Sequence, residues 1–169
     1  MIRADQHLVL VGLMGVGKTT VARVVADRLH RRVMDSDAII EARTGRTVRE
    51  IFADDGEAAF RQMETDVLIE ALALEEPCVI AGAGGVVLSD VNRAALKASG
   101  ARVIWLCADP ATLVDRVRAG GHRPLLDDDP AGTLQRMFRE REALYREVAD
   151  AIVLVDNRSI SEVVEAVLR

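Results

Sequence analysis

The stretch LVLVGLMGVGKTTVARVVADRL, from Leu8 to Leu29, decides the fold. An apolar run comes first, a glycine-rich turn follows, and a helical pattern comes last. The turn fits G-x-x-x-x-G-K-[ST], with Lys18 and Thr19 at its end. Between a strand and a helix, this pattern forms a loop whose backbone N–H groups hold phosphate. The stretch therefore predicts a nucleoside triphosphate site, because a glycine turn that only joins strand to helix leaves Lys18 and Thr19 unexplained.

The residues of this phosphate loop have separate tasks in this interpretation. Glycines let successive N–H groups converge on phosphate oxygens, Lys18 reaches the β and γ phosphates, and the Thr19 hydroxyl can bind Mg²⁺. The expected nucleotide-binding residues here are Gly12, Gly15, Val16, Gly17, Lys18, Thr19 and Thr20.

Five short apolar runs, with helical patterns between them, indicate an α/β fold. They cover residues 7–12, 31–35, 78–82, 102–107 and 151–156. Nearly continuous apolar character is typical of strands buried on both faces, so we expect a doubly wound, five-stranded parallel sheet flanked by helices. Side chains that can begin helices occur at Thr47 with Glu50, at Asp109 before Pro110, and at Ser159 with Glu162.

Composition limits the possible partners and location. The 169 residues suit one domain over 1–169, and a net charge of −5 argues against a protein that coats nucleic acid. No basic leader precedes the first strand and no apolar run approaches a membrane span, so we expect a cytoplasmic protein with no membrane partner. Cys78 and Cys107 lie in apolar runs and are expected to be buried, reduced thiols. We also expect a monomer.

The motif MDSD, which ends the second predicted strand, places Asp35 and Asp37 close together. If the strand continues through them, we expect the two carboxylates to point to opposite sides, one toward a metal and one toward an acceptor hydroxyl. The alternative is a solvated turn that caps the next helix. No N-K-x-D motif for guanine occurs, which argues against a regulatory GTPase and favours a small-molecule kinase.

Six motifs resemble those of the shikimate kinases in order and approximate spacing. They are GLMGVGKTT, DSDAIIEARTG, GEAAFRQME, AGAGG, RPLL and REREALY. The resemblance spans nearly the whole chain. It implies a P-loop kinase of the nucleoside-monophosphate-kinase type, which uses Mg²⁺ and transfers the γ-phosphoryl group of ATP to the 3-hydroxyl of shikimate in aromatic amino-acid biosynthesis.

The resemblance also implies residue roles. Asp35 joins Thr19 at the metal, and Asp37 orients or deprotonates the nucleophile. Arg61 and Arg141 clamp the shikimate carboxylate, a task that suits bidentate donors. Backbone groups of Gly84 and Gly85 complete the acid site, and the substrate-binding segment covers about 37–64. Arg61 could instead be a surface helix pair with Glu57 and Glu64.

The remaining implied roles concern the nucleotide and the lid. Arg123 belongs to a mobile lid over about 118–132 and meets the transferring phosphoryl group, so the catalytic set is Lys18, Asp37 and Arg123. Arg116 or Arg118, together with Arg158, is expected at the adenine, although solvated arginines would explain the same pattern.

Two aromatic residues and one departure from the family pattern leave further alternatives. Phe52 and Phe60 could line the pocket or the core, and Trp105 is expected in the core. Ala83 replaces the first of three consecutive glycines, which is harmless only if its φ is negative. This departure leaves open a kinase of another cyclitol or sugar acid, or a nucleotide-binding relative that has lost catalysis.

Overall fold

A five-stranded sheet forms the centre of the computed structural model, which describes residues 2–119 and 128–169. The strands are β1 (Leu8–Val11), β2 (Val33–Asp35), β3 (Val79–Ala81), β4 (Arg102–Cys107) and β5 (Ala151–Leu154). They lie in the order β2-β3-β1-β4-β5, and every pairing is parallel. The predicted fold class and the five predicted strands are therefore confirmed.

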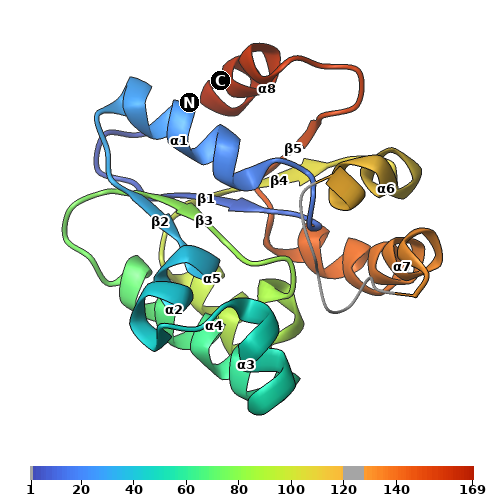
Figure 1. The fold of residues 1–169 in the computed structure, drawn as a ribbon. Coiled ribbons are helices and arrows are strands. Elements are labelled where there is room, and N and C mark those ends of the chain that lie inside the picture. The colour runs from blue at the N-terminus through green and yellow to red at the C-terminus, as the bar shows by residue number, and fades with distance from the viewer. Residues whose placement is uncertain (1, 120–127) are drawn as a thin grey trace.

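Helices cover both faces of this sheet (Figure 1). They are α1 (Lys18–Leu29), α2 (Ser36–Thr44), α3 (Val48–Asp54), α4 (Glu57–Leu72), α5 (Asp90–Ala98), α6 (Pro110–Ala119), α7 (Pro130–Val148) and α8 (Ile160–Leu168), with a 3₁₀ turn η1 (Val86–Leu88). In Figure 1, α1 and α8 lie on one face, whereas α4, α5 and α7 lie on the other. Within the described ranges, no helix combines the length and the apolar character needed to cross a membrane.

The predicted helix starts are present. Thr47 with Glu50, and Ser159 with Glu162, form complete capping boxes at α3 and α8. Asp109 accepts a hydrogen bond from the Ala111 amide at 2.8 Å, where α6 begins. These side chains satisfy backbone N–H groups that have no partner inside the helix.

The order of the strands creates a crevice beside β1. After β1 the chain crosses through α1 to β2 at one edge, whereas after β3 it crosses through α5 to β4 on the other side of β1. Adjacent parallel strands whose connections leave in opposite directions form a gap at their carboxyl ends, where ligands bind in folds of this type. The loops after β1 and β3 therefore face each other across this gap.

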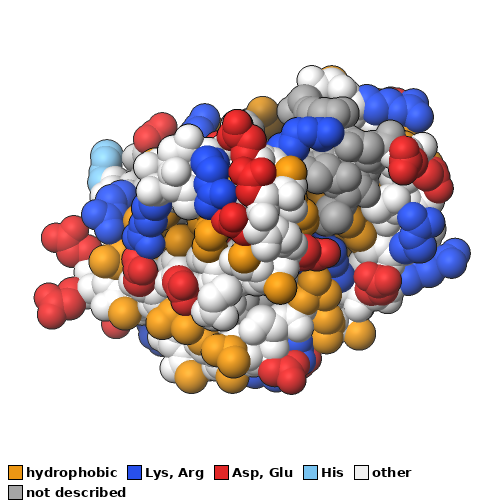
Figure 2. Space-filling view, turned by 60° about the horizontal axis from the view of Figure 1, so that its bottom comes forward, with side chains coloured by type: hydrophobic (Ala, Val, Ile, Leu, Met, Phe, Trp, Pro, Cys, Tyr) orange, Lys and Arg blue, Asp and Glu red, His pale blue; other side chains and the backbone are white. Residues whose placement is uncertain are grey.

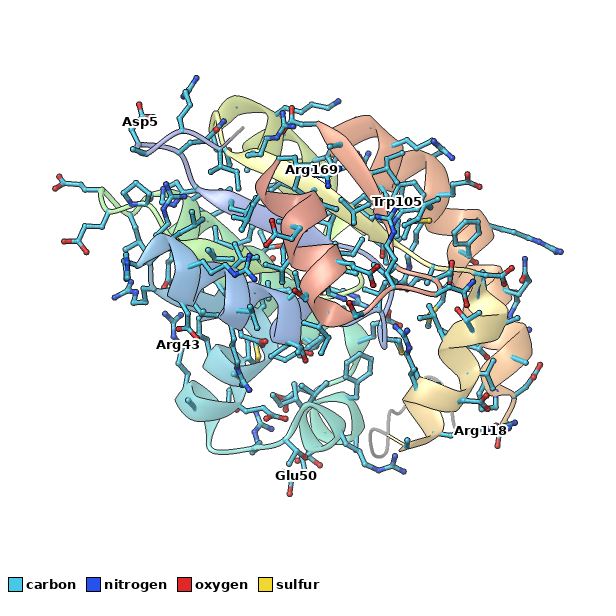
Figure 3. The ribbon with its side chains drawn as sticks, turned by 90° about the horizontal axis from the view of Figure 1, so that it is seen from above. Asp5, Arg43, Glu50, Trp105, Arg118 and Arg169 are labelled. Carbon is cyan, nitrogen blue, oxygen red and sulfur yellow. The ribbon has the colours of Figure 1, made fainter. Side chains whose placement is uncertain are left out.

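The main core packs on both faces of the sheet. Trp105 on β4 is 1% exposed, which confirms its expected core position, and Figure 3 shows it among the side chains between strands and helices. Cys78 and Cys107 are both free thiols, but only Cys78 is fully buried. Cys107 is half-buried because β4 ends there, at the rim of the sheet.

Two expectations about local structure were wrong. The second strand ends at Asp35, as the predicted run 31–35 does, but it does not continue to Asp37 and the two carboxylates do not alternate across a sheet, because Asp35 caps α2 and the backbone turns helical at Ser36. Helical geometry therefore separates Asp35 from Asp37; in a continued strand, residues two apart would share one face. Residues 120–127 of the lid expected over about 118–132 lie outside the described residues, and the described residues at both ends of this range are helical rather than loop. Arg118 lies in α6, and α7 begins at Pro130 because Asp129 caps it.

Candidate active site

A cavity of about 270 Å³ lies at the carboxyl ends of β1 and β3. Its walls come from the phosphate loop, the α2 to α4 region, the turn after β3, and α7. The lining residues are Met14, Gly15, Gly17, Lys18, Thr19, Thr20, Asp35, Asp37, Val48, Phe52, Phe60, Arg61, Glu64, Ala81, Gly82, Ala83, Gly84, Gly85 and Arg141. The structure thus brings together most of the residues that the sequence placed in separate motifs.

The phosphate loop depends on a close backbone contact. Gly12 has φ 145°, and a Cβ there would lie 2.4 Å from the carbonyl oxygen of Leu106, so only glycine fits. Lys18 Nζ donates to the carbonyl oxygens of Gly12 at 2.7 Å and Leu13 at 3.0 Å. Val16 is buried and is not among the residues that line the cavity. The loop therefore delivers the N-terminus of α1 to the cavity, and a helix N-terminus favours anions.

Asp35 has two partners. Its Oδ2 accepts a hydrogen bond from the Thr19 hydroxyl at 2.5 Å, and its Oδ1 accepts one from the Ala38 amide at 3.1 Å. Asp35 therefore caps α2, as the capping alternative predicted, and it also lies beside Thr19. The result is a pair of oxygen donors at the phosphate loop, the kind of donor that Mg²⁺ prefers.

Arg61 lies between two carboxylates of its own helix. Its Nη2 donates to Glu57 at 3.0 Å, and its Nη1 donates to both oxygens of Glu64 at 2.8 and 2.9 Å. The alternative in which Arg61 pairs with carboxylates of its own helix is therefore present. Glu57 is exposed, but Glu64 is only 2% exposed and lines the cavity. Burial raises the pKa of Glu64 to about 7, the Arg61 guanidinium opposes this rise, and nearby Asp37 adds to it.

Arg141 approaches the same cavity from α7. It is 4% exposed, and its Nη1 donates to the Gly84 carbonyl oxygen at 3.1 Å. Its Nε is buried and finds no acceptor among the described residues. An unpaired buried donor on a cation is costly, which makes this guanidinium a natural site for an anionic ligand.

The turn after β3 tolerates its alanine. Ala83 lies outside the left-handed region of φ, which in the described chain holds only His30 and Asn157 among the residues other than glycine. The methyl group of Ala83 is therefore unstrained, as the sequence predicted for a negative φ.

Other predicted site residues lie at the margin of the cavity or beyond it. Arg116 and Arg118 are exposed near the end of α6, where Figure 3 labels Arg118, and Arg158 is exposed after β5. Arg116 is the nearer of the first two to the phosphate loop, since a Cβ on Gly15 would lie 3.9 Å from its Cβ. Arg123 falls outside the described residues. The Phe52 and Phe60 rings lie 4.9 Å apart, line the cavity and also join a small core cluster, so both alternatives hold.

Sequence reasoning missed two participants. Glu64 appeared there only as a helix partner of Arg61, and its burial makes it part of the cavity wall. Tyr145, four residues after Arg141 on α7, is fully buried and donates to the same Gly84 carbonyl oxygen at 2.6 Å. The spacing of four, which puts both side chains on one helix face, is the signal that was available for Tyr145.

Comparison with known proteins identifies the relatives of this chain. The family model described as shikimate kinase matches residues 14–169. A shikimate kinase from Symbiobacterium thermophilum is 46% identical over 96% of this chain and 94% of its own length. The structure of shikimate kinase from Acinetobacter baumannii in complex with shikimate superposes with a TM-score of 0.91 at 35% identity, covering 96% of this chain and 90% of that one. A gluconokinase from Sinorhizobium meliloti, at 21% identity and TM-score 0.61 with coverages of 98% and 91%, shares the fold alone.

The raised pKa of Glu64 predicts a pH-dependent stability. The folded chain holds this proton up to about pH 7, whereas the ordinary pKa of a Glu carboxyl group is 4.5. The stabilisation is therefore present at low pH and is lost as pH rises through that window. The free energy of unfolding of the wild type should fall, relative to Glu64→Gln, by about 2 kcal/mol between pH 5 and pH 8.

Urea unfolding at several pH values measures this difference. Glu57→Gln removes the exposed partner of Arg61 and serves as the matched control, which should keep the wild-type pH slope. Parallel slopes for wild type and Glu64→Gln would show that the carboxyl group of Glu64 has an ordinary pKa.

Proposed function

The chain belongs to the shikimate kinase family, and on this premise we propose that its cavity transfers the γ-phosphoryl group of ATP to the 3-hydroxyl of shikimate. The products are shikimate 3-phosphate and ADP, in the pathway to aromatic amino acids. The observation that carries the choice of acceptor is the buried guanidinium of Arg141, whose Nε has no acceptor among the described residues, in the same cavity as Arg61. Two guanidinium groups in one cavity suit an acid substrate.

The phosphate loop supplies the nucleotide end of the site. We assign the ATP phosphates to the backbone of Gly12, Gly15, Val16 and Gly17, to Lys18, and to the first turn of α1 with Thr19 and Thr20. Lys18 is held by two loop carbonyls and lines the cavity, so its ammonium group lies where phosphoryl charge develops. Arg123 from the lid is proposed to meet the same charge, and Arg116 and Arg158 are proposed for the adenine side.

The acceptor end uses one carboxylate and two arginines. Asp37 is half-buried in the first turn of α2 and lines the cavity. This position suits a base that accepts the proton of the shikimate 3-hydroxyl while the oxygen of that hydroxyl bonds to the γ phosphorus of ATP. Arg61 and Arg141 bind the substrate carboxylate, with backbone groups of Gly84 and Gly85 beside them. Residues of 37–64 form the rest of this wall. Most of the catalytic effect comes from positioning and charge stabilisation.

Magnesium fits the oxygen donors at the loop. Mg²⁺ commonly binds through one or two protein oxygens plus substrate phosphates and water, and Thr19 with Asp35 supplies such a pair. No cluster of three or more His, Cys, Asp or Glu side chains suitable for a metal occurs in the described part of the chain, which agrees with a metal held jointly with ATP. When bound, the ion neutralises charge on the phosphates.

In this proposal the protein is a monomer in the cytoplasm. Its partners are two small molecules, ATP and shikimate. Figure 2 shows acidic and basic side chains interspersed over the face that it presents, without a continuous basic surface. Nucleic-acid binding through the phosphate backbone needs such a surface.

The function is tested by ADP release from purified enzyme with ATP and Mg²⁺. Shikimate should support turnover, whereas quinate, gluconate and nucleoside monophosphates should support little. Lys18→Ala, which removes a charge from the phosphates, should lower turnover at least about a hundredfold and thereby exclude a contaminating kinase. Turnover with gluconate but none with shikimate would replace the proposed acceptor.

The carboxylate clamp predicts a specific loss of discrimination. Arg61→Ala and Arg141→Ala should each lower kcat/KM for shikimate by roughly tenfold to a hundredfold, because a lost charge-assisted hydrogen bond costs about 1.5 to 3 kcal/mol. Both variants should also discriminate less than the wild type against the carboxamide analogue of shikimate.

Arg43→Ala is the control for this comparison, since Arg43 lies exposed on α2 and pairs with Glu70. It should keep wild-type discrimination. If the two site variants also keep the wild-type preference for carboxylate over carboxamide, the clamp is wrong and the acceptor must be sought among neutral polyols.

The two carboxylates are separated by their response to magnesium. Asp35→Asn should lose activity that is partly recovered at high Mg²⁺, whereas Asp37→Asn should stay slow at every Mg²⁺ concentration, since only Asp35 is assigned to the metal. Asn also caps helices well, so α2 should remain intact in Asp35→Asn. Equal recovery of both variants in a Mg²⁺ titration would contradict this division of roles.

A further inference from the structure

Tyr145 of the REREALY motif lies behind the cavity wall, where it contacts the lining residue Gly84, and the proposed function gives it no task. It is 0% exposed, and its hydroxyl donates to the Gly84 carbonyl oxygen at 2.6 Å. Its ring stacks on Trp105 of β4, with centroids 5.4 Å apart and planes 22° from parallel. A core residue at this position needs only the ring, so the hydroxyl requires a separate explanation.

The Gly84 carbonyl oxygen accepts two hydrogen bonds from α7. Arg141 Nη1 donates to it at 3.1 Å, alongside the Tyr145 hydroxyl at 2.6 Å. Burial raises the pKa of Tyr145 to about 12, so the hydroxyl keeps its proton and acts as a donor. Tyr145 therefore holds the carbonyl group against which the guanidinium of Arg141 is placed.

The same carbonyl group belongs to a peptide at the cavity wall. A trans peptide is planar, so fixing the Gly84 C=O also fixes the Gly85 N–H, which points the opposite way. Gly85 lines the cavity, and its amide donates no hydrogen bond to a residue within 2–119 and 128–169. Arg61 packs directly against Gly85, since a Cβ there would lie 2.1 Å from its Nη1.

We propose that Tyr145 is a positioning residue for the acid substrate, because its hydroxyl orients the Gly84–Gly85 peptide and Arg141 together. This inference rests on the proposed function, in which Arg141 binds the shikimate carboxylate. Tyr145 touches neither substrate, and its effect passes through groups that do. Its loss should weaken shikimate binding more than ATP binding.

Tyr145→Phe tests the proposal, since it keeps the stacked ring and removes only the donor. The KM for shikimate should rise about three- to tenfold, the range for one lost neutral hydrogen bond. The KM for ATP and kcat should stay within about twofold of wild type. Discrimination against the carboxamide analogue should also decrease.

Phe138→Leu is the matched control. Phe138 packs on the same Trp105, at a centroid distance of 6.3 Å, and donates nothing to Gly84. The Phe138→Leu variant should have a lower Tm than the wild type and an unchanged KM for shikimate. In an Arg141→Lys background, removal of the Tyr145 hydroxyl should have a smaller effect than in the wild type, because both side chains act on one carbonyl group.

The outcomes separate this inference from the function on which it rests. An active wild type with an unchanged KM for shikimate in Tyr145→Phe would overturn the positioning role and leave the function standing. Equal rises in the KM for shikimate and for ATP, accompanied by a lower Tm, would also overturn it, because they indicate general loosening. A wild type that does not phosphorylate shikimate would overturn both.

Discussion

The close approach of Gly12 to the carbonyl of Leu106 is the constraint on which the rest of the structure depends. A side chain at Gly12 would collide with the backbone of β4, at 2.4 Å from that oxygen. With glycine there, the loop after β1 turns tightly over the end of β4 and brings α1 to the crevice beside β3. The central position of β1 in the sheet gives the loops after β1 and β3 a common cavity.

Charges in this cavity are balanced between helices. Arg61 and Arg141 come from α4 and α7, and Glu64 and Asp37 come from α4 and α2. Glu64 pairs with Arg61, but it also bears the cost of burial, which is why its pKa rises. The balance leaves Arg141 as the cation with a buried, unpaired donor. A carboxylate ligand in this cavity would meet the guanidinium groups of both Arg141 and Arg61, so the electrostatics of the wall and the family of the chain point to the same acceptor.

For several residues, the two alternative roles that the sequence left open are both present in the structure. Asp35 caps α2 with one oxygen and receives the Thr19 hydroxyl on the other. Arg61 pairs with Glu57 and Glu64 on its own helix and lines the cavity. Phe60 belongs to a core cluster and to the cavity wall. Side chains with several polar atoms or two faces can stabilise an element and bind a ligand at once, so local pattern alone could not decide between these readings.

The sequence by itself determined the parallel α/β fold, the phosphate loop and most of the lining residues, because these depend on local signals such as apolar runs, glycine spacing and capping side chains. Only the tertiary structure decided that Glu64 is buried and that Tyr145 and Arg141 share the carbonyl of Gly84. Those facts depend on the packing of α4 and α7 against the turn after β3. Burial and shared acceptors arise from residues far apart in the chain, so no local pattern contains them.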